Sequence, residues 1–126
     1  MTETPPRTKP PRMTGVAHLL AAARYSGAGF RRLLRESAFR QELAIGGLVM
    51  AGLALAGAGW PRVLGFAVLL LVLVAVEALN TAIEVLVDQL SPGWSAFARD
   101  AKDLGSLAVG AMLAAMGLYL VWALLF

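Results

Sequence analysis

The chain has 126 residues, of which 59% are hydrophobic and 15% are charged, and it contains no cysteine. A soluble domain is about half apolar and about a quarter charged, so this composition excludes an ordinary soluble fold and favours a single membrane domain. The lack of cysteine excludes disulfides and thiolate metal sites. The net charge is +3, but the basic residues lie beside apolar stretches, which is typical of headgroup contacts rather than of nucleic-acid binding.

The N-terminal part of the chain divides into two segments. Residues 1–12 are rich in proline and basic residues and almost free of apolar ones, which predicts a disordered tail. In residues 13–35, apolar positions recur every three or four residues and arginines lie between them. This pattern predicts a basic amphipathic helix on the membrane surface, with a kink or break at the glycine-containing segment 26–29.

Three apolar stretches follow, at about 43–59, 63–90 and 104–126, and each is long enough to cross a membrane. The segment 59–62 predicts a tight turn, the segment 91–94 ends the second span, and the segment 95–103 predicts a polar loop. With Arg62 outside and the other basic residues inside, we expect the N-terminus to be cytoplasmic and the C-terminus to lie on the opposite side of the membrane. The predicted fold class is therefore an all-α membrane protein with three transmembrane helices and an N-terminal surface helix.

Polar residues occupy one face of the second span near its end. Glu77, Asn80, Thr81, Glu84 and Asp88 fall within roughly a third of the helix circumference. Carboxylates at membrane depth are costly unless they face a protein interior, a cavity or a partner charge, so this acidic stripe predicts a functional site. Glu77, the deepest, is the candidate general base, and Glu84 is a candidate ligand for a hard cation such as Mg²⁺.

Other segments supply candidates for the same membrane face. One carboxylate does not hold Mg²⁺ alone, and Glu36, at the end of the surface helix, lies at the right depth to be the second ligand. Lys102, next to Asp103, is suited to phosphate. His18, the only histidine, is read from the residues alone as a surface residue. The sequence has no phosphate-binding loop of the GxxxxGK[ST] type, so a nucleotide would be held by metal, Lys102 and surface groups.

Three segments resemble the prokaryotic diacylglycerol kinase family: Glu36–Glu42, Val76–Asp88 and Ala101–Ser106. The second contains the core Glu-x-x-Asn-[Ser/Thr]-Ala-Ile-Glu. The resemblance implies a homotrimer in the bacterial inner membrane, with active sites shared between protomers and a periplasmic C-terminus. It also implies transfer of the ATP γ-phosphate to the primary hydroxyl of diacylglycerol, giving phosphatidate. The family includes undecaprenol kinases with the same catalytic core, so undecaprenol stays open as the acceptor.

Matching positions carry the family's residue roles to this chain. The resemblance implies that Glu77 takes the proton from the lipid hydroxyl, that Asn80 supports it, and that Glu36 and Glu84 bind Mg²⁺. The positions implied for ATP are His18, Tyr25, Ser26, Glu36, Glu84, Ser95, Lys102 and Asp103. The positions implied for the lipid are Arg31, Ala38, Phe39, Arg40, Gln41, Glu42, Glu77 and Ser106.

Two other functional classes, a transporter and a structural subunit, explain these residues less well than a kinase does. A small proton-coupled transporter could use Glu77 as its relay, but it would bind no nucleotide and would not need Lys102. A structural membrane subunit would not explain the acidic stripe. The small residues Ser106, Gly110 and Ala114, spaced four apart, predict a face for close helix contact and suggest oligomerisation.

Overall fold

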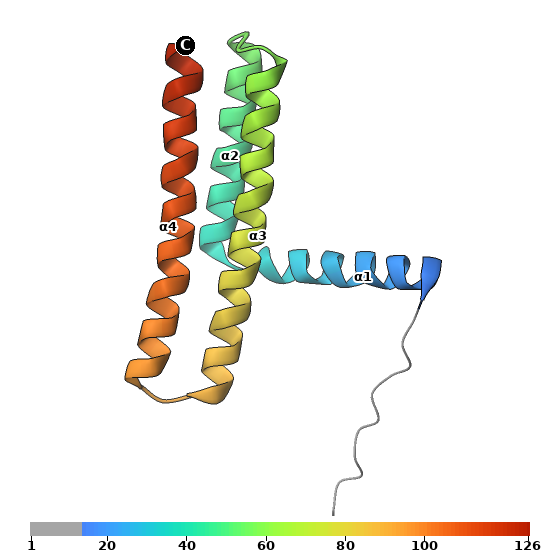
Figure 1. The fold of residues 1–126 in the computed structure, drawn as a ribbon, viewed down its shortest axis with the longest axis vertical. Helices are drawn as coiled ribbons and strands as arrows, with labels where there is room; N and C mark the ends of the chain where they lie inside the picture. Colours follow the sequence, from blue (N-terminus) through green and yellow to red (C-terminus); the bar gives the residue numbers. More distant parts are fainter. Residues whose placement is uncertain (1–13) are drawn as a thin grey trace, which may run out of the picture.

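The computed structural model describes residues 14–126, which form four α-helices joined by short connections. These helices are α1 (Gly15–Leu33), α2 (Ser37–Leu55), α3 (Trp60–Leu90) and α4 (Ala96–Leu125). The last three lie side by side and are long and apolar enough to cross a membrane, while α1 extends away from their side (Figure 1). The predicted all-helical fold with three spans is confirmed. The predicted tail, residues 1–12, lies outside the described residues.

The structure corrects the predicted interruption of the first helix. Helix α1 runs without a break through residues 26–29. A glycine in a helix costs only about 1 kcal/mol relative to alanine, and alanine and arginine, both good helix formers, lie around this segment. Helix α1 therefore tolerates both Gly27 and Gly29.

The turn between the first two spans also lies earlier than predicted. Helix α2 begins at Ser37 and ends at Leu55, so it starts before the predicted residue 43. Gly57 and Gly59 have positive φ angles of 71° and 82°, which a residue with a side chain rarely adopts. Helix α3 starts directly afterwards with Pro61 in its first turn, where a missing N–H leaves no hydrogen bond unmade. Residues 60–62 therefore belong to the helix and not to the turn.

The predicted polar loop 95–103 is wrong for most of its length. Helix α4 begins at Ala96, because Ser95 caps it: the Ser95 hydroxyl accepts a hydrogen bond of 3.1 Å from the Ala98 backbone N–H. The segment is polar, but polarity does not prevent helix formation at the end of a span. The predicted end of the second span is confirmed, since α3 stops at Leu90.

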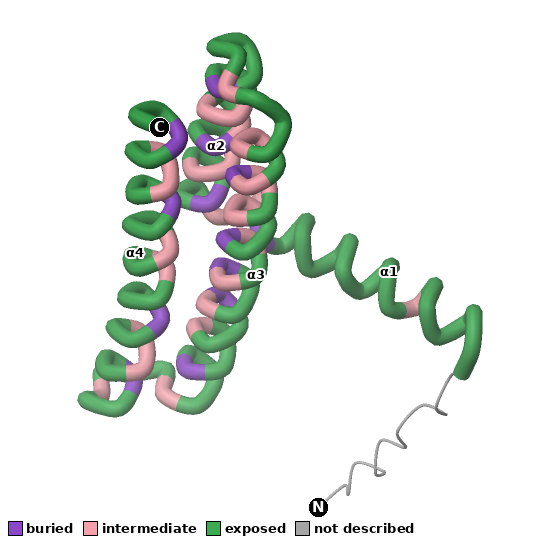
Figure 2. Tube along the Cα trace, turned by 45° about the horizontal axis from the view of Figure 1, so that its top comes forward, coloured by how far each residue is buried: buried purple, intermediate pink, exposed green. Residues whose placement is uncertain are grey.

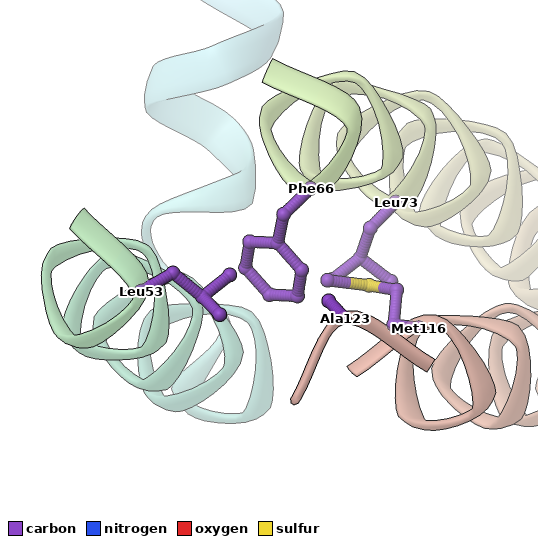
Figure 3. Packing of buried hydrophobic residues seen from close by; sticks show 5 residues of the cluster. All are labelled: Leu53, Phe66, Leu73, Met116 and Ala123. Carbon is purple, nitrogen blue, oxygen red and sulfur yellow. The ribbon is translucent and has the colours of Figure 1, made fainter. Parts of the chain in front are cut away.

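Helix α3 is the centre of the fold and packs against α1, α2 and α4. Five buried apolar side chains connect the three long helices: Leu53, Phe66, Leu73, Met116 and Ala123 (Figure 3). They come from the end of α2, the first half of α3 and the last third of α4. The remaining surface of these helices is largely exposed (Figure 2), as suits contact with lipid. This apolar core fills one end of the bundle and leaves the end near the α3–α4 loop to polar side chains.

Candidate active site

A cleft of about 280 Å³ lies between the start of α2, the last half of α3 and the first half of α4. It is lined by Glu36, Ala38, Phe39, Glu42, Glu77, Asn80, Thr81, Glu84, Ser106 and Val109. Four carboxylates thus meet in one hollow within a single chain. We refer to it below as the carboxylate cleft.

Two residues of the acidic stripe that line this cleft are buried. Glu77 is 8% exposed and Thr81, one helical turn further along α3, is 7% exposed. Glu42, from α2, lines the same cleft as Glu77. One Glu42 oxygen is buried without a protein partner among the described residues. The stripe therefore faces protein and not the acyl chains.

Asn80 links the stripe to the next carboxylate. Its amide nitrogen donates a hydrogen bond of 3.2 Å to the carboxylate of Glu84, four residues later on α3. The other end of the amide, its oxygen, is buried and has no hydrogen-bond partner in the described part of the chain. Asn80 thus fixes the orientation of Glu84.

The donor set of the carboxylate cleft fits a hard cation that is also bound by phosphate. Glu36 and Glu84 both line the cleft, and Glu36 also forms an ion pair of 2.5 Å with Arg32. Over residues 14–126, no group of three or more acidic or histidine side chains is close enough to hold a metal on its own. Mg²⁺ is commonly held by one or two carboxylates, with phosphate oxygens and water completing its octahedron. Two carboxylates facing a shared hollow match that need.

A second cleft, of about 250 Å³, lies beside the α3–α4 loop. Its lining includes Asp88, Ser95, Arg99 and Lys102. The Lys102 ammonium lies 2.6 Å from a carboxylate oxygen of Asp88 and so ties the end of α3 to the start of α4. Two of the positions predicted to bind the nucleotide, Ser95 and Lys102, therefore share a hollow that is separate from the carboxylate cleft. We refer to it as the loop cleft.

The remaining predicted positions lie outside both clefts. His18, Tyr25 and Ser26 are exposed on α1, where Tyr25 and Arg31 contribute to a surface hollow of about 480 Å³. Asp103 and Gln41 are exposed as well. A single chain therefore brings together only part of the predicted set.

Arg40, a predicted lipid contact, has a structural role at the junction of the first two helices. Its guanidinium donates hydrogen bonds of 3.0 Å to the backbone carbonyls of Leu34 and Arg35. Since these carbonyls follow α1, the bonds hold the end of α1 against the start of α2.

The sequence-based site prediction did not include Thr81, Val109 or Arg32. Thr81 belongs to the acidic stripe but was given no role, and Val109 follows Ser106 by three residues on the same face of α4, a spacing that could have indicated it. The ion pair of Arg32 with Glu36 also follows helical spacing, since the two are four residues apart.

The sequence model of one family, described as prokaryotic diacylglycerol kinase, matches residues 24–126. The chain is 42% identical over 115 residues to a protein named diacylglycerol kinase from Sinorhizobium sp, which covers 91% of this chain and 84% of that protein. It is 37% identical over 119 residues to a protein of the same name from Escherichia coli K12, covering 89% and 91% of the two chains. A third relative of that name, from Pseudomonas aeruginosa, is 41% identical over 97 residues, covering 75% and 78%.

Proposed function

This chain belongs to the prokaryotic diacylglycerol kinase family, and from that premise we propose that it transfers the ATP γ-phosphate to the primary hydroxyl of diacylglycerol, giving phosphatidate and ADP. Its family membership makes it a lipid kinase, as the sequence motifs predict. The observation that carries the proposal is the carboxylate cleft, because it places a buried glutamate beside two carboxylates suited to a phosphate-bound metal. Neither a transporter nor a structural subunit needs that arrangement.

The proposed reaction uses Glu77 as the general base. The lipid hydroxyl oxygen forms a bond to the γ-phosphorus, and its proton passes to the Glu77 carboxylate. The bond between the γ-phosphorus and the oxygen that bridges to the β-phosphate breaks, and ADP leaves with that electron pair. Burial of Glu77 on the inner face of α3 supports this role, because the base meets a lipid hydroxyl there more readily than water.

Glu36 and Glu84 are the proposed Mg²⁺ ligands. When bound there with the nucleotide, Mg²⁺ would offset negative charge on the phosphates. The protein directs both carboxylates toward one hollow. The Asn80 amide orients the Glu84 carboxylate by donating a hydrogen bond to it.

The lipid is proposed to reach the carboxylate cleft from the membrane. Of the predicted lipid positions, Ala38, Phe39, Glu42, Glu77 and Ser106 line this cleft, which supports a shared site for the hydroxyl and the base. The cleft opens beside helices that carry exposed apolar residues, so the acyl chains can stay in lipid while the hydroxyl enters.

The proposed assembly is a homotrimer in the bacterial inner membrane, with its N-terminus in the cytoplasm. The three apolar helices and a prokaryotic family support the inner membrane. Helix α1 exposes Val16, Leu19 and Leu20 together with Arg24, which supports its placement on the membrane surface. A neighbouring protomer would complete a nucleotide site whose predicted parts line separate hollows in one chain.

A competition assay tests the acceptor. We expect purified protein in lipid micelles to transfer labelled phosphate from ATP to diacylglycerol in preference to undecaprenol when both are present at equal mole fraction. The shared name of the relatives supports this order. Preferential labelling of undecaprenol would assign the chain to the other branch of the family, and labelling of neither lipid would contradict the proposed function.

Neutralising each partner of the Lys102–Asp88 ion pair in turn separates phosphate binding from structure. Lys102→Met is expected to raise the KM for ATP by about 10-fold or more, because a lysine point charge on phosphate is lost. Asp88→Asn is expected to change it by less than about fivefold, since the Lys102 and Asp88 side chains are 43% and 62% exposed and water screens their attraction. Initial rates over a range of ATP concentrations give both values. Equal damage from the two variants would mean that the ion pair, and not a phosphate contact, is what Lys102 provides.

A further inference from the structure

A glycine of α4 lies directly opposite Asn80. Gly105 is buried between α4 and α3, and a Cβ atom built there would overlap the amide oxygen of Asn80. The same atom would lie 3.3 Å from the Asn80 Cγ and 4.0 Å from its Cβ. The conflict therefore involves only the amide group of Asn80 and not its helix.

The space open to the Asn80 amide is the carboxylate cleft, which it lines. Its nitrogen donates the 3.2 Å hydrogen bond to Glu84, and its buried oxygen is directed at α4. A methyl group at residue 105 must rotate or shift this amide, because α3 and α4 are packed along their length. Any such movement lengthens or breaks the bond to Glu84.

We propose that Gly105 is a positioning residue of the kinase site: with no side chain at this position, Asn80 can hold Glu84 in the orientation that the metal-bound nucleotide needs. The proposal rests on the proposed function, because it assigns Glu84 to the metal. Gly105 acts through Asn80 and touches no reacting atom.

The test compares two glycines of the same helix. Gly105→Ala is expected to weaken binding of Mn²⁺ with β,γ-methylene-ATP by about 10-fold, the lower end for loss of a group that orients a metal ligand. Gly117→Ala is the matched control, because a Cβ there meets nothing within 4 Å. It should bind within twofold of the unmodified protein. Electron paramagnetic resonance titration of free Mn²⁺ in lipid micelles reads this affinity without turnover. Equal affinities for the two variants would overturn the proposal.

A double variant asks whether the effect passes through the amide. Asn80→Ala keeps the Cβ that lies 4.0 Å from the new methyl, an ordinary contact, and removes the atoms that conflict with it. Asn80→Ala alone should weaken Mn²⁺ binding about as much as Gly105→Ala, and the two together should be no worse than Asn80→Ala. A further loss in the double variant would show that Gly105 serves helix packing, and would overturn the proposal.

Folding is measured beside binding, because Gly105→Ala could disturb the α3–α4 contact. If that variant alone does not fold, the double variant is expected to fold, since its methyl meets no amide. A double variant that also fails to fold would overturn the inference. These outcomes differ from a failure of the proposed function, in which the unmodified protein itself would phosphorylate neither diacylglycerol nor undecaprenol.

Discussion

Glu77→Gln is expected to reduce kcat for diacylglycerol phosphorylation by at least about 100-fold, while the protein stays folded in micelles. The amide has nearly the shape of the carboxylate but cannot accept the hydroxyl proton. An amide at residue 77 can also donate a hydrogen bond to the Glu42 carboxylate, which lines the same cleft. The loss should therefore appear in turnover and not in the thermal unfolding temperature. Radiolabelled phosphate transfer and circular dichroism measure the two quantities.

The control for this variant is Asp100→Asn on α4. This variant also replaces a carboxylate by an amide, but the Asp100 side chain is exposed and, within residues 14–126, forms an ion pair only with the neighbouring Arg99. Its kcat should stay within about twofold of the unmodified protein. Near-normal activity of Glu77→Gln would remove Glu77 from the role of base. Equal losses of kcat in both variants would mean that any lost negative charge slows the enzyme, whatever its position.

Glu84→Gln and Glu36→Gln are each expected to raise the Mg²⁺ concentration for half-maximal rate by about 10-fold or more. Replacing a carboxylate by an amide removes the charge that a hard divalent cation prefers. The KM for diacylglycerol should change little, because the lipid hydroxyl is assigned to Glu77. Rates measured over a range of Mg²⁺ at saturating ATP and lipid give the requirement directly.

Glu36→Gln needs a control of its own, since it also weakens the ion pair with Arg32. Arg32→Gln breaks that pair and leaves the Glu36 carboxylate in place. Both side chains are near half exposed, 44% and 43%, so loss of the pair alone should move the Mg²⁺ requirement by less than about threefold. A metal requirement unchanged in both glutamine variants would count against Glu36 and Glu84 as ligands.

The site could be predicted in outline because helical periodicity is a local property. Glu77, Asn80 and Glu84 share one face of any regular helix over this segment, whatever packs against it. Charge at membrane depth then indicated that this face meets protein, and the cleft bears this out. The position of Glu36 beside the same cleft followed from topology, since the end of the first helix and the end of the second span were expected at one membrane face.

The sequence by itself determined the number of spans, the face that carries the acids and the membership of the family, since apolar length, helical period and a specific motif are all read along one chain. The tertiary structure alone decided that the Asn80 amide oxygen is buried opposite α4. It also decided that Lys102 lies in a cleft apart from Glu84, and that a Cβ at residue 105 would overlap the Asn80 amide oxygen. These features depend on how closely and at what rotation two helices approach, which the side-chain volumes at their contact fix and a single helix does not.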